Sequence, residues 1–128
     1  MIFDFLKKRL NSFRYAFAGI KELWVKEKNT RIHMFFTIVA IAAGFLLKIS
    51  PLEFALLILT IAAVWGMEAI NSGVERVVDL VTLEKKPLAK AAKDLAAGAV
   101  LIIAMASAII GLIIFLPKII QLFVLNFS

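Results

Sequence analysis

Four polar residues near the middle of the chain could do chemistry, and they follow one another at intervals of three, four and four: Glu68, Asn71, Glu75 and Asp79. On a helix these positions fall within about 80° of one face. A carboxylate in or near a bilayer core is expensive and is therefore a functional candidate. The functional interpretation is a cation site beside a general base, because carboxylates bind Mg²⁺ together with phosphate and water, and a further carboxylate can accept a hydroxyl proton. The structural alternative is a set of ion pairs with Arg76 or Lys93 that fixes helix packing.

A second candidate is the charged pair Lys93-Asp94, which opens a long apolar stretch. A lysine at this position can neutralise a phosphate as a point charge. The alternative is an ordinary cytoplasmic lysine that snorkels to the interface. The sequence contains no P-loop and no kinase catalytic loop, so carboxylate-bound metal and scattered Lys and Arg are the available phosphate-binding groups.

The composition indicates a membrane protein. The 128 residues are 62% hydrophobic with a mean hydropathy of +0.96, more than a soluble domain of this size can bury in one core. The chain has no Cys, which excludes disulfides, Cys-ligated zinc and thiol catalysis, and its one His disfavours His-rich metal sites and Ser-His-Asp triads. The high apolar content also excludes extended disorder.

The apolar stretches predict a single all-α membrane domain over residues 1–128, with an interfacial helix at 1–29 and transmembrane helices at 30–50, 51–82 and 87–116. The alternative for the first two spans is a pair of buried helices in a soluble protein. Ser50-Pro51-Leu52-Glu53 predicts a capping box after a very short turn. The helix from Pro51 would be about 45 Å long, so its last third projects beyond the hydrocarbon core. Pro117 is expected to end the last helix.

Lys and Arg are distributed unevenly, which predicts the orientation. Thirteen of them precede residue 32 or lie between residues 76 and 93, whereas only Lys48 and Lys118 fall on the other side. The positive-inside rule then places the N-terminus in the cytoplasm and the C-terminus outside a multi-pass cell-membrane protein. No cleavable signal peptide is visible. A nucleic-acid partner is not expected, because the basic residues would lie at the membrane surface.

The N-terminal segment carries apolar residues at helical spacing: Phe3, Leu6, Leu10, Phe13, Phe17, Ile20 and Trp24. Lys7, Arg14 and Lys21 flank this stripe. The pattern predicts a helix that lies in the membrane interface with its apolar face among the acyl chains. A coiled-coil seam is the alternative, although Phe is a poor seam residue.

Two segments resemble the signatures of the small prokaryotic diacylglycerol kinase family: Glu68-Ala-Ile-Asn-Ser-Gly-Val-Glu-Arg-Val-Val-Asp79 and Ala89-Lys-Ala-Ala-Lys-Asp-Leu-Ala-Ala-Gly-Ala-Val100. The resemblance extends from about residue 11 to residue 117. Residues 27–33, 87–98 and 111–118 look most like the Gram-positive branch, which acts as undecaprenol kinase. His33 stands where the diacylglycerol branch carries a glutamate, which disfavours diacylglycerol itself as the substrate.

The resemblance implies an interfacial helix, three spans and a homotrimer with active sites built between subunits. It also implies ATP, Mg²⁺ and a membrane lipid alcohol as substrate. Glu68 matches the catalytic base, and Glu27 and Glu75 match metal ligands that also contact ATP. Other positions match the surroundings of the nucleotide: Tyr15, Asp79, Glu84, Lys85, Lys86, Lys93 and Asp94. The expected substrate-binding residues are Arg9, Trp24, Glu68 and Asn71, with Lys8 as the alternative to Arg9.

The expected function is therefore an undecaprenol kinase that gives undecaprenyl phosphate. The alternative within the family is a diacylglycerol kinase that gives phosphatidic acid. The alternative from another class is a small proton-coupled exporter with an intramembrane glutamate. An exporter needs its carboxylate near the bilayer midplane, whereas the polar residues here lie toward the cytoplasmic end of their helix.

Overall fold

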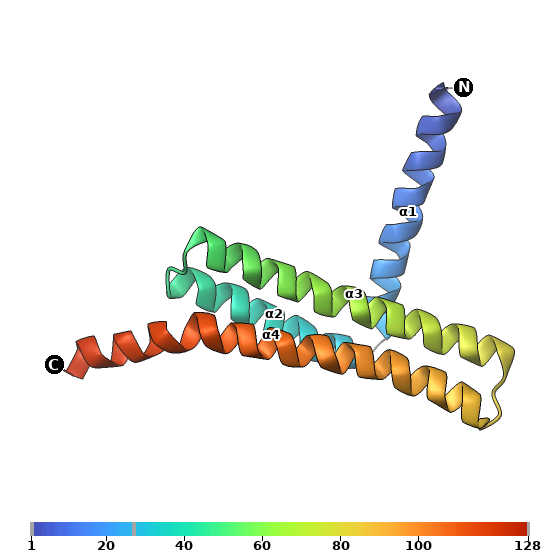
Figure 1. Ribbon diagram of the computed structural model, residues 1–128. Helices are drawn as coiled ribbons and strands as arrows, with labels where there is room; N and C mark the ends of the chain where they lie inside the picture. The colour runs from blue at the N-terminus through green and yellow to red at the C-terminus, as the bar shows by residue number, and fades with distance from the viewer. Residues whose placement is uncertain (1, 27, 128) are drawn as a thin grey trace. The chain divides into compact units, whose positions relative to one another are not determined.

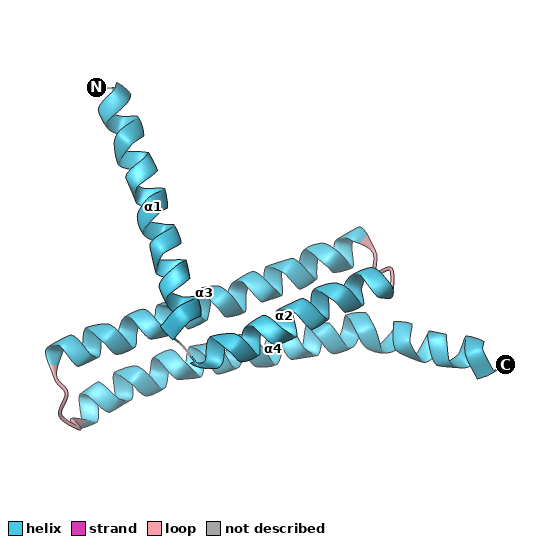
Figure 2. Cartoon of the chain, turned by 180° about the vertical axis from the view of Figure 1, so that it is seen from behind, coloured by secondary structure: helices cyan, strands magenta, loops and turns pink. Residues whose placement is uncertain are grey.

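The computed structural model describes residues 2–26 and 28–127, and that part of the chain consists of helices joined by short loops (Figure 2). It contains α1 (Ile2–Lys26), α2 (Lys28–Leu46), α3 (Pro51–Val81) and α4 (Pro87–Phe127). The chain divides into two compact units, residues 1–32 and 33–128. The all-α expectation is confirmed.

The first unit is dominated by α1, whose expected apolar stripe is exposed along its whole length. The exposed stripe residues are Phe3, Leu6, Leu10, Phe13, Phe17, Ile20 and Trp24. The guanidinium of Arg9 lies 5.1 Å from the centre of the Phe5 ring, where a cation–π attraction holds it near the helix surface. An apolar face this exposed is suited to the interfacial position that the sequence predicts.

In the second unit, α3 runs antiparallel to both α2 and α4 (Figure 1). The α2–α3 turn lies at one end of the three helices, together with the C-terminus, and the α3–α4 loop lies at the other. α3 and α4 are packed closely along their lengths. This arrangement brings the end of α3, with its acidic residues, beside the lysine-rich start of α4.

The α2–α3 turn is built as the sequence predicts. The Ser50 hydroxyl accepts a hydrogen bond from the Glu53 backbone N–H, and the Glu53 carboxylate accepts one from the Ser50 N–H at 2.6 Å. Lys48 adopts a left-handed conformation with φ of 49°, which lets the Ile49 N–H reach the Gly44 carbonyl at 3.1 Å. The chain therefore reverses direction within four residues while satisfying the first free donors of α3.

The core of the second unit is small and lies near this turn. Ile49, Leu57 and Ile114 are its buried members, and Phe54 packs against them. Elsewhere most large apolar side chains of α3 and α4 are exposed. Within the described residues, α3 and α4 are each long and apolar enough to cross a membrane. α1 and α2 meet the same requirements of length and hydropathy only when they are taken together, so there is a third span if these two helices form one. The chain is thus a membrane protein, and the apolar outer faces of its helices are not covered by other described parts of the chain.

The expected helix end at Pro117 is wrong. α4 continues through Pro117 to Phe127. Proline in a helix interior removes one hydrogen bond and crowds the preceding turn, but apolar residues such as Ile119 and Ile120 follow it, and a helix is the only way to satisfy their backbone groups in an apolar setting. A single lost hydrogen bond costs less than unwinding the ten residues that follow.

Candidate active site

Glu68 is buried inside the second unit and is held by a histidine from the neighbouring helix. His33 Nε2 lies 2.6 Å from Glu68 Oε1, and the two side chains are 24% and 10% exposed. A carboxylate withdrawn from water needs a hydrogen-bonding or charged partner. His33 supplies that partner from α2, which the short α2–α3 turn folds back alongside α3.

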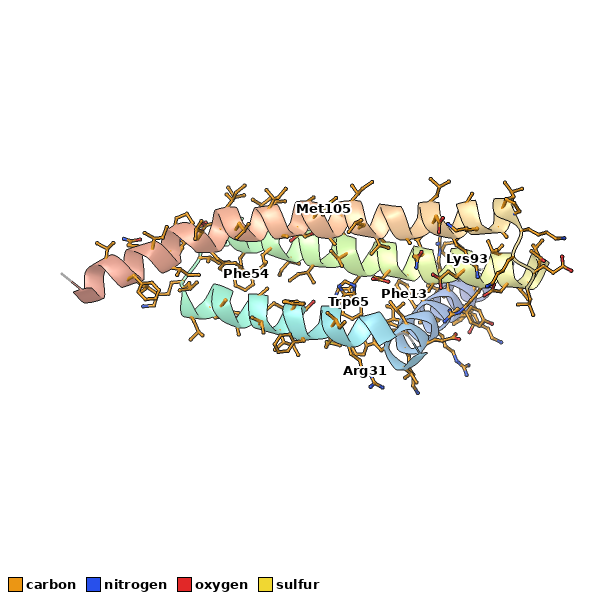
Figure 3. The ribbon with its side chains drawn as sticks, turned by 90° about the horizontal axis from the view of Figure 1, so that it is seen from below. Phe13, Arg31, Phe54, Trp65, Lys93 and Met105 are labelled. Carbon is orange, nitrogen blue, oxygen red and sulfur yellow. The ribbon has the colours of Figure 1, made fainter. Side chains whose placement is uncertain are left out.

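A second polar link joins the same two helices close by. Trp65 Nε1 donates to Thr37 Oγ1 at 3.1 Å, and the Trp65 side chain lies between α2 and α3 (Figure 3). Thr37 lies one turn after His33 on α2, and Trp65 lies almost one turn before Glu68 on α3. The two links therefore both join α2 to the polar face of α3.

Asn71 and Glu75 form an oxygen-rich pair further along α3. Asn71 Nδ2 donates to Glu75 Oε1 at 3.1 Å, as the i, i+4 spacing allows. Asn71 Oδ1 is buried and accepts no hydrogen bond within the described part of the chain. A buried acceptor without a donor beside a carboxylate is a favourable setting for a cation.

These donors fit Mg²⁺, which prefers hard oxygen ligands and usually takes one or two protein carboxylates while phosphate and water complete its shell. Among the described residues, no three His, Asp or Glu side chains converge on one point. Glu27, the other expected metal ligand, lies outside the described residues. Within the described residues, Glu75 and Asn71 are thus candidate oxygen ligands for a metal whose other ligands are not supplied by the protein.

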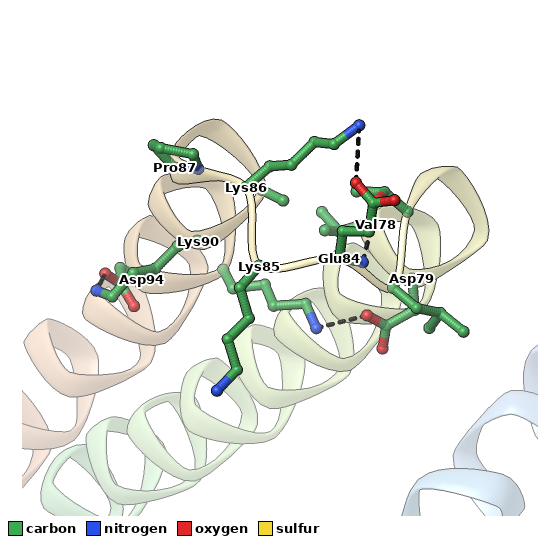
Figure 4. Close-up of a pocket in the computed structure, with 12 residues that line it drawn as sticks. Val78, Asp79, Glu84, Lys85, Lys86, Pro87, Lys90 and Asp94 are labelled. Carbon is green, nitrogen blue, oxygen red and sulfur yellow. Dashed lines mark hydrogen bonds and ion pairs between the residues drawn. The ribbon is translucent and has the colours of Figure 1, made fainter.

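A pocket of about 620 Å³ opens where α3 and α4 meet their connecting loop (Figure 4). Six of the residues expected around the nucleotide line it: Asp79, Glu84, Lys85, Lys86, Lys93 and Asp94. Lys90 and Thr82 also line it. Four lysines around one cavity favour an anionic ligand such as a nucleotide phosphate.

Three of the four lysines that line this pocket are paired with its acidic residues. Lys93 Nζ lies 2.6 Å from Asp79 Oδ1, Lys86 Nζ lies 3.4 Å from Glu84 Oε2, and Lys90 pairs with Asp94. The first pair joins α4 to α3 and is one of the ion pairs that the structural alternative for the polar residues of α3 predicts. Exposed ion pairs of this kind contribute about 0–1 kcal/mol, so a phosphate can compete for these lysines at little cost.

The remaining predicted residues are placed separately. Arg9, Tyr15 and Trp24 lie on α1 in the first unit, where all three are exposed. Sequence reasoning missed Lys90, Thr82 and the contact between His33 and Glu68. The spacing of Lys90 and Asp94 by four could have indicated their pair, whereas no local pattern connects His33 to a residue 35 positions away.

Comparison with known proteins identifies the family of the chain. The family described as "Prokaryotic diacylglycerol kinase" matches residues 14–115. A Bacillus subtilis protein named "Undecaprenol kinase" is 42% identical over 88% of this chain and 92% of its own length. A Synechocystis protein named "Diacylglycerol kinase" is 42% identical over 90% of this chain and 66% of its own length. A Pseudomonas aeruginosa protein with the same name is 37% identical over 73% of this chain and 76% of its own length.

The matched region contains α3, the pocket and the start of α4, and it covers most of the chain. The kinase interpretation therefore holds, and the exporter alternative is set aside. The chain belongs to the prokaryotic diacylglycerol kinase family and is a membrane-embedded lipid kinase.

Proposed function

We propose that the chain phosphorylates undecaprenol to undecaprenyl phosphate, with ATP as phosphoryl donor and Mg²⁺ as cofactor. The observation that carries the proposal is the order of polar groups along α3. The buried Glu68 comes first, the Asn71–Glu75 oxygen pair follows, and the lysine-lined pocket lies at the loop end. A lipid hydroxyl, the phosphates of ATP and the rest of the nucleotide would meet these groups in the same order.

In this proposal Glu68 accepts the proton of the lipid hydroxyl. The lipid oxygen forms a bond to the γ-phosphorus of ATP while the bond from that phosphorus to the β–γ bridging oxygen breaks, and ADP leaves. Glu75 and Asn71 would hold Mg²⁺, which neutralises charge on the phosphates when bound. Lys93 offsets the remaining negative charge from α4. Phosphoryl transfer needs mainly positioning and electrostatics, so a scaffold of this size is sufficient.

The same proposal includes the membrane orientation and the assembly. The pocket would face the cytoplasm, where ATP is available, with the N-terminus on the same side and the C-terminus outside. Small residues at the start of α4 let helices approach closely in lipid, namely Ala92, Ala96, Gly98 and Ala99. A homotrimer would bring a neighbouring Glu27 to the metal, as the resemblance implies.

Two observations bear on the lipid. The relative named undecaprenol kinase matches this chain over 92% of its own length, which favours undecaprenol. The equally identical relative named diacylglycerol kinase keeps diacylglycerol as the second candidate. Both lipids present a hydroxyl at the membrane interface, so Glu68 could serve either.

Transfer of labelled phosphate from [γ-³²P]ATP to lipids in mixed micelles tests the proposal. We expect kcat/KM to be higher for undecaprenol than for diacylglycerol, with product formation lost in Glu68→Gln. Phosphorylation of diacylglycerol with little transfer to undecaprenol would establish the second candidate. Absence of transfer to any lipid alcohol by folded, ATP-binding protein would contradict the proposed chemistry.

A further inference from the structure

A histidine occupies one oxygen of the proposed catalytic carboxylate. His33 Nε2 lies 2.6 Å from Glu68 Oε1, and Glu68 is among the few buried polar residues in the described part of the chain. When the carboxylate is ionised, the Nε2–H is the donor and Oε1 is the acceptor. This bond leaves Oε2 as the oxygen that can receive a proton from a substrate hydroxyl.

The contact also restricts the rotation of the Glu68 side chain. A glutamate has three rotatable side-chain bonds, and fixing its carboxylate requires a second contact beyond the backbone. General-base catalysis requires the acceptor to lie within about 3 Å of the proton it removes. A donor from a different helix meets this requirement, because its position is set by tertiary packing and not by the α3 backbone.

His33 is not needed simply to hold α2 against α3. The hydrogen bond from Trp65 to Thr37, at 3.1 Å, joins the same helices about one turn away. Ala40 of α2 also packs against the core near the turn. The contact between His33 and Glu68 is therefore not the single link between α2 and the rest of the second unit.

We propose that His33 is a positioning residue for the kinase reaction: by binding Glu68 Oε1 it aims Oε2 at the lipid hydroxyl. The inference rests on the proposed role of Glu68 as the general base. It adds a residue of α2 to a site that is otherwise built from α3 and α4.

The test compares three variants in lipid phosphorylation by the full chain. His33→Leu removes the donor, His33→Gln keeps an N–H donor on a flexible side chain, and Thr37→Val removes the neighbouring link as a matched control. We expect His33→Leu to lower kcat by about 10- to 100-fold, less than the roughly 10²–10⁴-fold that a general base itself contributes, with KM for ATP and lipid changed by less than about threefold. His33→Gln should recover most of the rate, and Thr37→Val should retain it.

A double-mutant cycle shows whether His33 acts through Glu68. In a Glu68→Gln background, His33→Leu should cause no further loss of kcat, because the carboxylate that it positions is already gone. Equal kcat values for wild type and His33→Leu, or fully additive losses in the cycle, would overturn the inference.

Folding and the proposed function are checked separately. ATP binding and the thermal unfolding midpoint in detergent report on folding, and His33→Phe offers a second variant without the donor. Loss of folded protein in both His33→Leu and His33→Phe would assign His33 to stability and overturn the inference. A wild-type protein that transfers no phosphate to any lipid alcohol would instead contradict the proposed function.

Discussion

Lys93 and Lys118 make comparable contacts at opposite ends of α4. Lys93 pairs with Asp79 at 2.6 Å beside the pocket, and Lys118 pairs with Glu53 at 3.3 Å near the α2–α3 turn. Each pair joins α4 to α3, and the side chains are all partly exposed. The two ion pairs should therefore make similar and small contributions to stability. The property that should distinguish the two lysines is the use of ATP, which we expect to depend on Lys93 alone.

Lys93→Ala should raise KM for ATP by about tenfold or more, because a charge-assisted hydrogen bond is worth about 1.5–3 kcal/mol. Lys118→Ala should leave KM for ATP unchanged and shift the unfolding midpoint no more than Lys93→Ala does. Steady-state kinetics with varied ATP measure both effects. Equal losses of ATP use in the two variants would show that the pocket is not the nucleotide site.

At the scale of elements, the α2–α3 turn sets the register of α2 against α3 and hence the contact between His33 and Glu68. Gly44 permits this turn because it has no side chain, so the side chains of Ile49 and Phe54 can pack close to its backbone. A Cβ at Gly44 would lie 3.1 Å from Ile49 Cδ1 and 3.1 Å from Phe54 Cε2. A Cβ at Gly66, on α3, would meet nothing within 4 Å.

Gly44→Ala should lower the free energy of unfolding by about 1–3 kcal/mol, because two packed side chains must shift to admit the methyl group. Gly66→Ala is the control and should leave stability unchanged or raise it by up to about 1 kcal/mol through helix propensity. Unfolding in mixed detergent micelles measures the difference. A more stable Gly44→Ala variant would mean that this turn is looser than described.

Local sequence signals were sufficient to predict where α3 begins. Ser50 and Pro51 predict the start of α3, and the capping box forms as expected. The prediction that the last helix ends at Pro117 was wrong, because the hydrogen bond lost at the proline costs less than unwinding the apolar residues that follow it. A rule that considers the proline alone does not include those residues.

The candidate site likewise has a part that the sequence predicts and a part that it does not. The polar face of α3 and the pocket residues around Lys93 follow from helical spacing and from the family resemblance. The pairing of His33 with Glu68 was missed, because it depends on how α2 packs against α3 and no periodicity reports that contact.

At the scale of the whole molecule, the dominant feature is apolar surface without a cover. Among the described apolar residues of the second unit, just the small cluster around Ile49, Leu57 and Ile114 is buried, while long rows of Leu, Ile and Phe are exposed on its helices. Lipid can cover part of this surface, and further copies of the chain can cover the rest.

We expect the purified protein to be a trimer in detergent, with activity confined to the trimer. The reason is the small-residue face at the start of α4 together with the need for a further carboxylate at the metal. Sedimentation in density-matched detergent, with kinase activity assayed across the peak, measures both. A fully active monomer would contradict this expectation.

The orientation can be tested cleanly because the chain has no cysteine. Lys86→Cys should react with a membrane-impermeant maleimide only after the cells are permeabilised, because the α3–α4 loop is proposed to face the cytoplasm. Lys48→Cys, in the α2–α3 turn, should react in intact cells. The reverse labelling pattern would place the pocket outside the cell.

The most direct test of the central claim compares the Mg²⁺ dependence of Glu68→Gln and Glu75→Gln. The two residues lie two turns apart on α3, so spacing alone cannot separate their roles. If Glu75 binds the metal, Glu75→Gln should need more Mg²⁺ and regain part of its rate as Mg²⁺ is raised. If Glu68 is the base, Glu68→Gln should lose about 10²–10⁴-fold in kcat at every Mg²⁺ concentration. Recovery of Glu68→Gln by Mg²⁺, with none for Glu75→Gln, would contradict the assignment of both residues.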